Sequence, residues 1–536
     1  MTQLPSVQHA IQIVGVDEIV HNTSKPVDPV GPHQMMLEVE SCGICFSDTK
    51  LLHAFDSHPR KTDVIAGISP EALAEIPGYK PGGAPTVPGH EPVGRIVEVG
   101  DEVTHFTVGD RVLVQADWKH LRTPKSNGAF GYNFEGALQE YVVIDERTVV
   151  SPSGEEFLIH VSDGPSAAAV GLIEPWATVE GSYAWVERGH VQDGGRLLVV
   201  TAGGAPGIEA LTAGHAPAEI VTVSPSGLAG LEGQAFDDIV FYGSDADAIE
   251  AAAALLGSRA TFCLVLGGER IGRKVNLDIG RVHYDFIRFV GTTGSDPADG
   301  YAWVPATGEL RAGDKVVIIG AAGPMGTMHT IRAVTSGVEG ITVTGTDVST
   351  DRLEHLAAIV DPIAEARGVP FSYINSAETQ LEPGYTHLSC MVPVPALVSQ
   401  AVDLAADGAI LNAFAGIPAG TTGEFDLQGI VERRIFMLGT SGSDVSDMRT
   451  VLRKIEEGII DTHISLDAVT GMAGFRDAID SVINRTSGGK IMVYPRLHDL
   501  PLTRLVDMPE KLPHVAAKLN NGIWTKEAEQ ALLAGA

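Results

Sequence analysis

Two stretches of the chain follow the same order of an apolar strand, a glycine-rich turn and the start of a helix. The first is GGRLLVVTAGGAPGIEAL, residues 194–211, and the second is GDKVVIIGAAGPMGTMHTI, residues 313–331. Glycines in such a turn let the backbone bend sharply and let the helix begin close to the strand. An uninterrupted apolar strand before a helix is typical of a parallel sheet that is covered on both faces. The chain is therefore expected to contain α/β units with parallel sheets.

The similarity continues beyond the two turns. Residues 236–268 align with 385–417, and each segment has a strand, an alanine-rich helix and a second strand. Residues 275–296 align with 425–444, and these segments end in GTTGSD and GTSGSD. All parallel α/β units resemble one another to some degree, but matched order, spacing and end motif favour a repeat. We predict two tandem Rossmann-type units.

The predicted division of the chain follows from this repeat. A chain of 536 residues is too long for one hydrophobic core. Short strands around Gly-Asp turns predict a mostly β domain before the repeat, and helical patterns follow the repeat. The predicted domains are residues 1–185, 186–300, 301–442 and 443–536, the last of which completes the first domain and ends in a helical tail.

Only the second copy of the repeat has the residues expected of a dinucleotide site. Glycines let the turn approach a pyrophosphate at the helix N-terminus. Asp347 ends the next strand, where a carboxylate accepts hydrogen bonds from the ribose hydroxyls and repels a 2′-phosphate. We therefore predict NAD as the cofactor, while Arg352 leaves use of NADP open. The predicted cofactor contacts are Gly320, Gly323, Pro324, Met325, Gly326, Asp347 and Arg352.

The first copy differs at these positions. Thr201 replaces the first glycine, and the strand after the turn ends at Ser224 without an acidic residue. The carboxylate that would bind the ribose is therefore missing. We predict that the first copy is a structural duplicate without a cofactor.

The motif CGICFSD, residues 42–48, places two cysteines in a tight turn, which is typical of a metal site or a redox disulfide. The strand-like run before the motif is not the usual context of a redox pair, and four cysteines in the chain are no disulfide framework. A thiolate from Cys45, the imidazole of His90 and a carboxylate from Glu91 or Glu174 would suit Zn²⁺ with one open position. We predict one catalytic zinc site from these four residues.

Taken in order, CGICFSD, GHEPVGRIVEVG, GALQEYV, EPWA and GAAGPMG resemble the zinc-dependent medium-chain dehydrogenase/reductase superfamily, and most closely its sorbitol and polyol branch. The resemblance covers nearly the whole chain except the first repeat copy, an insertion at 54–84 and the C-terminal tail. It implies a GroES-like catalytic domain with Cys45 as the zinc thiolate and with His90 and Glu91 in the GHE turn. It also implies that Glu174 takes the place of a cysteine of the alcohol dehydrogenase branch, and which glutamate binds zinc directly stays open.

The chain also departs from the family pattern. The lobe that often holds a structural zinc with four cysteines has none here, so we expect no structural zinc. Cys42 is expected to be a turn residue, and Lys50 stands where many members have a relay histidine. If the insertion lies over the site, it brings basic side chains that can hold a phosphate or carboxylate; a solvated loop is the alternative. These side chains are His58, Arg60, Lys61 and Lys80.

The resemblance implies hydride transfer between a secondary alcohol and NAD. Zinc would lower the pKa of the substrate hydroxyl, and the carbon would pass a hydride to the nicotinamide. Ser47 stands at the relay hydroxyl position of the family, and Asp48 is expected to orient the site. Trp176 is expected in the core, with packing against a sugar as the alternative. The expected small-molecule substrate is a polyol, a sugar or a sugar phosphate, or the matching ketone.

The charge and the hydropathy of the chain limit the kinds of partner that it can bind. A formal net charge of −31 disfavours nucleic acid and anionic membranes, and no apolar run is long enough to span a bilayer. The first residues lack a signal-peptide pattern, so we expect a cytoplasmic protein.

Family members often pair the edge strands of two Rossmann sheets, so the repeat predicts either a homodimer or a monomer that imitates one. Two other classes stay open: a zinc-independent reductase-like protein, and a non-catalytic binding protein that uses the first copy as an interaction platform.

Overall fold

The computed structural model describes residues 4–535. The chain forms two compact units. The first unit contains the described residues up to Thr178 and those from Ser443 onward, and the second unit is Val179–Gly442. The predicted α/β fold class with parallel sheets is confirmed. None of the described helices has the length and hydrophobicity needed to cross a membrane.

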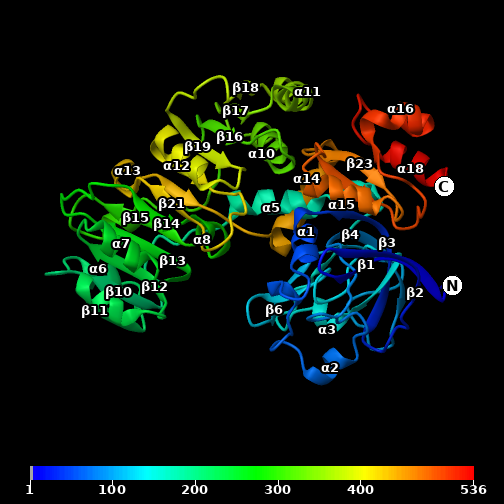
Figure 1. The fold of residues 1–536 in the computed structure, drawn as a ribbon, viewed down its shortest axis with the longest axis horizontal. Helices are drawn as coiled ribbons and strands as arrows, with labels where there is room; N and C mark the ends of the chain where they lie inside the picture. Colours follow the sequence, from blue (N-terminus) through cyan, green and yellow to red (C-terminus); the bar gives the residue numbers. More distant parts are fainter. Residues whose placement is uncertain (1–3, 536) are drawn as a thin grey trace. The chain divides into compact units, whose positions relative to one another are not determined.

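The first unit is built around an eight-stranded, mostly antiparallel sheet (Figure 1). Its main path runs through β25 (Thr503–Arg504), β23 (Leu466–Thr470), β24 (Lys490–Val493), β3 (Gln34–Ile44), β4 (Glu91–Val99), β5 (Arg111–Val114) and β9 (Leu158–His160), and β8 (Tyr141–Asp145) pairs with β3. Strands β1 (Val7–Gly15) and β2 (Glu18–Pro26), and strands β6 (Asp117–Arg122) and β7 (Asn127–Ala129), form two smaller ladders. Because β24 pairs with β3, the C-terminal part of the chain completes the sheet that the N-terminal part begins.

Short helices surround this sheet, and one longer helix leads out of the unit. The helices are α1 (Phe46–His53), α2 (Pro70–Ala74), α3 (Glu146–Val149), α4 (Ala167–Gly171), α14 (Val445–Glu456), α15 (Phe475–Ile483), α16 (Met508–Lys511), α17 (Pro513–Ala516) and α18 (Lys526–Ala534). Helix α5 (Ile173–Ala184) begins in the first unit and continues into the second.

The second unit contains two parallel sheets. The five-stranded sheet has the order β11 (Glu219–Val223), β10 (Arg196–Val200), β12 (Phe236–Tyr242), β13 (Leu256–Val265) and β15 (Arg288–Thr292). The six-stranded sheet has the order β18 (Phe371–Asn375), β17 (Thr342–Asp347), β16 (Lys315–Ile319), β19 (Tyr385–Cys390), β20 (Ala405–Asn412) and β22 (Phe436–Leu438). The helices of this unit are α6 (Ile208–Thr212), α7 (Ala246–Ala253), α8 (Ile279–Tyr284), α9 (Ala298–Tyr301), α10 (Pro324–Val334), α11 (Thr350–Arg367), α12 (Pro395–Leu404) and α13 (Leu427–Arg433).

The two parallel sheets have the same strand order over most of their width. Strands β10, β12, β13 and β15 occupy the same places in one sheet as β16, β19, β20 and β22 in the other. The six-stranded sheet continues beyond β17 with α11 and β18, whereas β11 is followed by a 3₁₀ segment, Pro225–Leu231, and stays at the edge. This arrangement agrees with two consecutive Rossmann-type units, while the duplication and the domain boundaries stay predictions.

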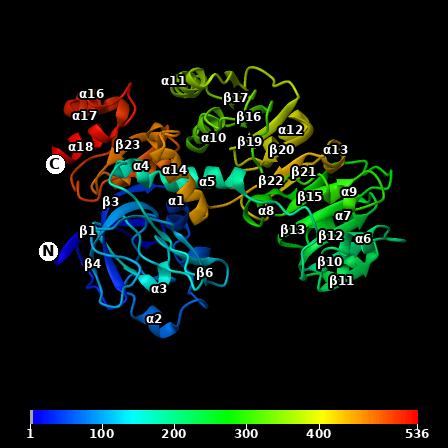
Figure 2. The ribbon, with the colours of Figure 1, turned by 180° about the vertical axis from the view of Figure 1, so that it is seen from behind.

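The two sheets meet along their last strands. Strands β14 (Val275–Asp278) and β21 (Thr422–Phe425) form an antiparallel ladder, and β15 contacts β22. Figure 2 shows α8, α13, β15 and β21 gathered where the green and yellow segments meet. One hydrophobic core contains side chains of both segments, among them Phe289 and Met437. Strands β15 and β22 are therefore in contact but belong to separate hydrogen-bonded sheets, so the two units do not form one continuous sheet, and imitation of a dimer stays a prediction.

A buried ion pair reinforces this junction. Arg288 on β15 donates from Nε and Nη2 to the two carboxylate oxygens of Glu187, each at 2.9 Å. Nη2 also donates to the carbonyl oxygen of Gly439, just after β22, at 3.2 Å. The Arg288 and Glu187 side chains are only 6% and 4% exposed. The pair therefore joins the ends of the two sheets away from water.

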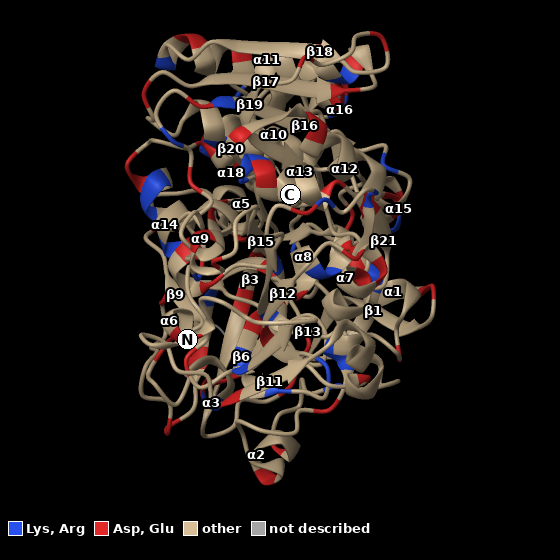
Figure 3. Ribbon diagram, turned by 90° about the vertical axis from the view of Figure 1, so that its left-hand side faces the viewer, with Lys and Arg blue, Asp and Glu red and all other residues tan. Residues whose placement is uncertain are grey.

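The chain is strongly acidic. Acidic side chains outnumber basic ones, 68 to 37, and Figure 3 shows red segments on helices and loops of both units. A local cluster of basic groups is thus unusual in this protein.

We expect Glu187→Ala to lower the free energy of unfolding by about 3–5 kcal/mol, because the substitution leaves Arg288 buried without its carboxylate. Urea unfolding at neutral pH measures the change. The control is Asp247→Ala, which breaks the Arg273–Asp247 pair, whose carboxylate is 93% exposed. This control should cost less than about 1 kcal/mol. Equal effects of the two substitutions would contradict a stabilising role for the buried pair.

Candidate functional site

The predicted metal cysteine opens helix α1. Cys45 is the N-cap residue, and its backbone N–H donates to Asp48 Oδ2 at 2.9 Å. A carboxylate three residues into a helix is a common partner for an N-cap amide. This contact explains why a helix begins directly after the cysteine turn, and it leaves the second oxygen of Asp48 to bind elsewhere.

The second ligand turn is brought beside the first by the pairing of β3 with β4. Gly43 lies opposite Glu91 in this ladder, and Cys42 lies opposite Pro92. Glycine is required at position 43, because an added Cβ would stand 2.1 Å from Glu91 Oε2. The backbone of Gly89 has φ +96°, a conformation that favours glycine, just before His90. The strand register therefore decides which residues meet at the site.

Three of the four predicted metal ligands form one group. The ligand atoms of Cys45, His90 and Glu91 all lie within 4.8 Å of one another. His90 and Glu91 are buried, and Cys45 is half-buried. A sulfur, a nitrogen and an oxygen donor at this spacing fit Zn²⁺. The buried Oε2 of Glu91 has no hydrogen-bond partner, which also fits a site that can bind a cation.

Asp48 orients the imidazole of His90. Asp48 Oδ1 lies 3.2 Å from His90 Nδ1, and Ser47 Oγ lies 3.0 Å from His90 Nε2. Burial by itself would raise the pKa of Asp48, but the neighbouring His90 outweighs burial and lowers this pKa. An ionised Asp48 favours a proton on Nδ1, which leaves Nε2 on the side of Ser47 as the metal-binding nitrogen. Both Ser47 and Asp48 thus lie beside His90, and their roles in catalysis stay predictions.

Sequence reasoning missed Lys490. Its Nζ lies 2.6 Å from Glu91 Oε1, and the two side chains are 8% and 0% exposed. Lys490 begins β24, and the next residue, Ile491, pairs with Ile44 beside the cysteine turn. Burial would lower the pKa of Lys490, but Glu91 outweighs burial and raises it, so the pair is ionic. A lysine at the head of the apolar strand KIMV was the available signal.

Glu174 stands outside the three-residue group. It lies at the start of α5, and burial, followed by the charge of Glu91, raises its pKa to about 7. Two carboxylates that repel each other beside a thiol and an imidazole are stabilised when a divalent cation binds near them. Glu174 is therefore near enough to serve the site, but the structure does not place it among the closest ligand atoms.

Two residues of the motifs take structural positions. Cys42 is fully buried, and burial raises the pKa of its thiol, so it stays protonated. Trp176 is 1% exposed and donates from Nε1 to Ser465 Oγ at 3.1 Å. Trp176 is thus a core residue, as the sequence analysis expected.

The insertion contributes one basic side chain to the neighbourhood of the site and buries another. Arg60 Nη2 donates to Asp117 Oδ2 at 3.1 Å, and its guanidinium lies 5.3 Å from the centre of the Tyr132 ring. The Tyr132 ring also lies 5.4 Å from the ring of His90. Lys61 is instead fully buried and donates to three backbone carbonyls, so it is not available to a ligand. Sequence reasoning missed Tyr132.

The predicted cofactor turn follows β16. Gly320 has φ +82°, and a Cβ on Gly326 would stand 2.2 Å from the Gly320 carbonyl oxygen, so helix α10 starts very close to the strand. Pro324 opens α10, where its missing N–H costs nothing, and Met325 follows it. Because α10 begins at this turn, its first backbone N–H groups are available to an anion such as pyrophosphate.

The predicted ribose carboxylate ends the neighbouring strand. Asp347 is the last residue of β17, and its Oδ1 accepts backbone hydrogen bonds from Val348 and Ser349 at 2.9 and 3.2 Å. Arg352 Nη2 lies 3.5 Å from Asp347 Oδ2, and Arg352 also reaches the space above Gly323. The seven predicted cofactor residues therefore gather at the carboxyl ends of β16 and β17.

The corresponding glycine turn of the first copy, which follows β10, has different neighbouring residues. Its helix α6 has five residues, none of them buried. A Cβ on Gly207 would stand 2.6 Å from Asp296 Oδ1, so a carboxylate lies beside the turn. A negative charge at that place disfavours a pyrophosphate. After β11, Ser224 bonds Ser226 instead of offering a carboxylate.

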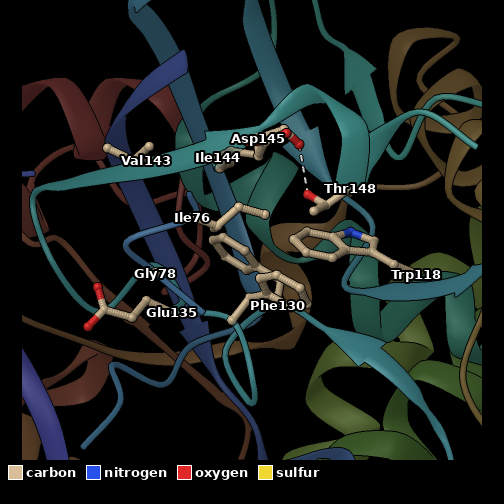
Figure 4. A pocket seen from close by; sticks show the side chains of 10 residues that line it. Ile76, Gly78, Trp118, Phe130, Glu135, Val143, Ile144, Asp145 and Thr148 are labelled. Carbon is tan, nitrogen blue, oxygen red and sulfur yellow. Dashed lines mark hydrogen bonds between the residues drawn. The ribbon is translucent and has the colours of Figure 1, made fainter. Parts of the chain in front are cut away.

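The pocket drawn in Figure 4 lies away from the ligand group. It is lined mainly by apolar side chains, among them Ile76, Trp118 and Phe130. The Asp145 carbonyl accepts a hydrogen bond from Thr148 Oγ1 at its rim. None of the residues that line it is a predicted ligand, so this pocket belongs to the core.

Comparisons with known proteins agree with this geometry. A family model described as the alcohol dehydrogenase GroES-like domain matches residues 31–153. Mannitol-1-phosphate 5-dehydrogenase of Aliivibrio fischeri is 28% identical over 249 residues, which are 42% of this chain and 57% of that protein. The chain thus spans a little more than half the length of this relative.

Solved structures show the fold over nearly the whole chain. The structure of 2R,3R-butanediol dehydrogenase from Bacillus subtilis matches with a TM-score of 0.53 and 16% identity, covering 91% of this chain and 99% of that chain. Acetophenone reductase from Geotrichum candidum in complex with NAD matches with a TM-score of 0.51 and 12% identity, covering 92% of this chain and 98% of that chain. Residues 31–153 therefore form an alcohol dehydrogenase GroES-like domain, and the solved dehydrogenase structures share the fold of this chain.

Proposed function

We propose that the chain is a zinc-dependent dehydrogenase that transfers a hydride between a secondary alcohol and NAD(H). The observation that carries this proposal is the group of Cys45, His90 and Glu91 within 4.8 Å. The curated relative is named for mannitol 1-phosphate, which supports a substrate with several hydroxyl groups: a polyol, a sugar or a sugar phosphate.

When bound, Zn²⁺ would lower the pKa of the substrate hydroxyl, and NAD would accept the hydride. The residues of the chain supply the rest of the chemistry. Ser47 Oγ, beside His90 Nε2, is placed to take the hydroxyl proton and pass it toward solvent. Asp48 holds the His90 ring, and Lys490 balances the charge of Glu91. Glu174 is the second carboxylate available to the site.

The cofactor part of the proposal depends on the second parallel sheet. The turn at Gly320 and the carboxylate of Asp347 support NAD, because a carboxylate at the end of β17 repels a 2′-phosphate. Arg352 lies 3.5 Å from that carboxylate, so weaker use of NADP is compatible with the site. We propose that the first sheet, which has Asp296 beside its turn, binds no dinucleotide.

We also propose that the chain is a monomer that imitates a dimer. The last strand of the six-stranded sheet, β22, contacts β15 of the same chain, and β14 pairs with β21. A second chain would have to displace these contacts in order to pair at the same edge.

We expect Cys45→Ser to lower bound zinc and to reduce the rate of NAD reduction by at least about 100-fold, because a serine hydroxyl is a poor zinc ligand at neutral pH. Metal analysis and absorbance at 340 nm measure the two effects. Cys42→Ser is the matched control, since Cys42 is in the same turn but protonated and buried. Full activity of metal-free Cys45→Ser protein would contradict the proposal.

Titration with NADH should give one binding site per chain. Asp347→Asn should weaken NADH binding by about tenfold and reduce the preference for NAD over NADP, because it removes the charge that faces the ribose. Ser224→Ala, at the corresponding place in the first copy, should leave the affinity unchanged. Fluorescence titration and calorimetry measure both quantities, and two sites per chain would show that the first copy also binds a dinucleotide.

Light scattering should give a molar mass close to 56.4 kDa, that of one chain, over a wide range of protein concentration. The physical reason is that the sheet edge at β22 is already covered by β15. A constant mass of two chains would show that the contact between the two sheets does not replace a partner subunit.

A further inference from the structure

The insertion at 54–84 is held in place from inside. The Lys61 ammonium donates to the carbonyl oxygens of Lys80, Gly82 and Ala84 at 2.6–2.8 Å. Three carbonyl acceptors use all three ammonium hydrogens. The short 3₁₀ turn Pro59–Lys61 is therefore anchored, and the residues beside Lys61 have a defined position.

This anchored turn places two nitrogen-rich side chains against Tyr132. The His58 ring stacks on the Tyr132 ring at 5.1 Å, and the Arg60 guanidinium lies 5.3 Å from the same ring. The metal-site residue His90 also lies against this ring, at 5.4 Å. One buried tyrosine therefore contacts both the basic pair and the imidazole of the ligand group.

Both side chains have hydrogen-bond donors beyond their contacts in the protein. His58 Nδ1 accepts from the Arg60 backbone N–H at 3.2 Å, so the neutral ring carries its proton on Nε2 and can donate there. Burial, and then the charges of Arg60, Lys50 and His90, lower the pKa of His58 to about 4, so the ring is neutral at pH 7. The guanidinium of Arg60 has five N–H donors, and its bonds to Asp117 and to the Tyr132 side chain leave the others for a ligand.

Cationic side chains gather at this place although the chain as a whole is acidic. The net charge is −31, yet Lys50 and Arg60 lie near the neutral His58. The carboxylates that face them are Asp117, which holds the guanidinium, and Glu174, whose charge also acts on Arg60. An arginine held at one nitrogen by a carboxylate keeps a planar donor edge for a second anion.

We propose that Arg60 and His58 bind a phosphate monoester group of the substrate, so that the chain prefers a phosphorylated polyol or sugar to the unphosphorylated compound. This inference rests on the proposed dehydrogenase function. A phosphate monoester carries close to two negative charges at neutral pH and has three acceptor oxygens. It therefore matches a guanidinium, an imidazole N–H and the nearby charge of Lys50 better than a single carboxylate does.

The test compares a hexitol phosphate, the matching hexonate and the unphosphorylated hexitol as substrates with NAD⁺. Wild-type protein should use the hexitol phosphate with the highest kcat/KM. Arg60→Met should raise the KM for the phosphate ester by about tenfold to 100-fold and lower kcat/KM for the hexitol by a much smaller factor, because the hexitol has no phosphate for Arg60 to bind. Arg60→Lys should recover part of the loss. The matched control is Arg122→Met, at an exposed arginine of β6.

A binding measurement separates this inference from the proposed function. Calorimetry with the hexitol phosphate and metal-free protein should show binding to the wild type that weakens at least about tenfold in Arg60→Met, and circular dichroism should show an unchanged fold. If no alcohol is oxidised but this difference is found, the dehydrogenase proposal fails and the phosphate site stands. The inference is overturned if hexitol or hexonate is preferred, or if Arg60→Met weakens ester and hexitol equally.

Discussion

The buried ion pair between Glu91 and Lys490 is the interaction on which the candidate site depends. It joins residues 399 positions apart at 2.6 Å, with almost no exposure to water. Removing either charge would leave the other buried without a partner, which is strongly destabilising. The pair also holds one oxygen of Glu91, while the second oxygen has no hydrogen-bond partner. A fold contact thereby fixes the side chain of a predicted metal ligand.

Asp48 holds the two other residues of the ligand group, Cys45 and His90, in position. One of its oxygens caps helix α1 through the Cys45 amide, and the other lies beside His90 Nδ1. The same carboxylate therefore positions the thiol turn and the imidazole together. This double use explains how the motif CGICFSD holds the predicted ligands Cys45 and His90 together.

The second unit shows how a sheet without the features of a cofactor site can still have a structural role. The first copy has a short, exposed α6, an acid beside its glycine turn and β11 at the sheet edge. Yet its last strand contacts β22, its β14 pairs with β21, and its Arg288 bonds the Gly439 carbonyl. The residues predicted to bind a dinucleotide follow β16 and β17, whereas the contacts between the sheets involve β14, β15, β21 and β22, so one set can change without the other.

The sequence by itself determined the α/β class, the glycine turns at Gly320 and Gly326, and the motif residues Cys45, His90 and Glu91. These features are local, because apolar runs, glycine positions and short motifs are visible over a few neighbouring residues. Tertiary structure alone decided that Lys490 meets Glu91, that Tyr132 contacts both His90 and Arg60, and that Lys61 is buried while Arg60 is not. Those contacts depend on strand register and on chain segments far apart in sequence, and neither residue spacing nor composition contains that information.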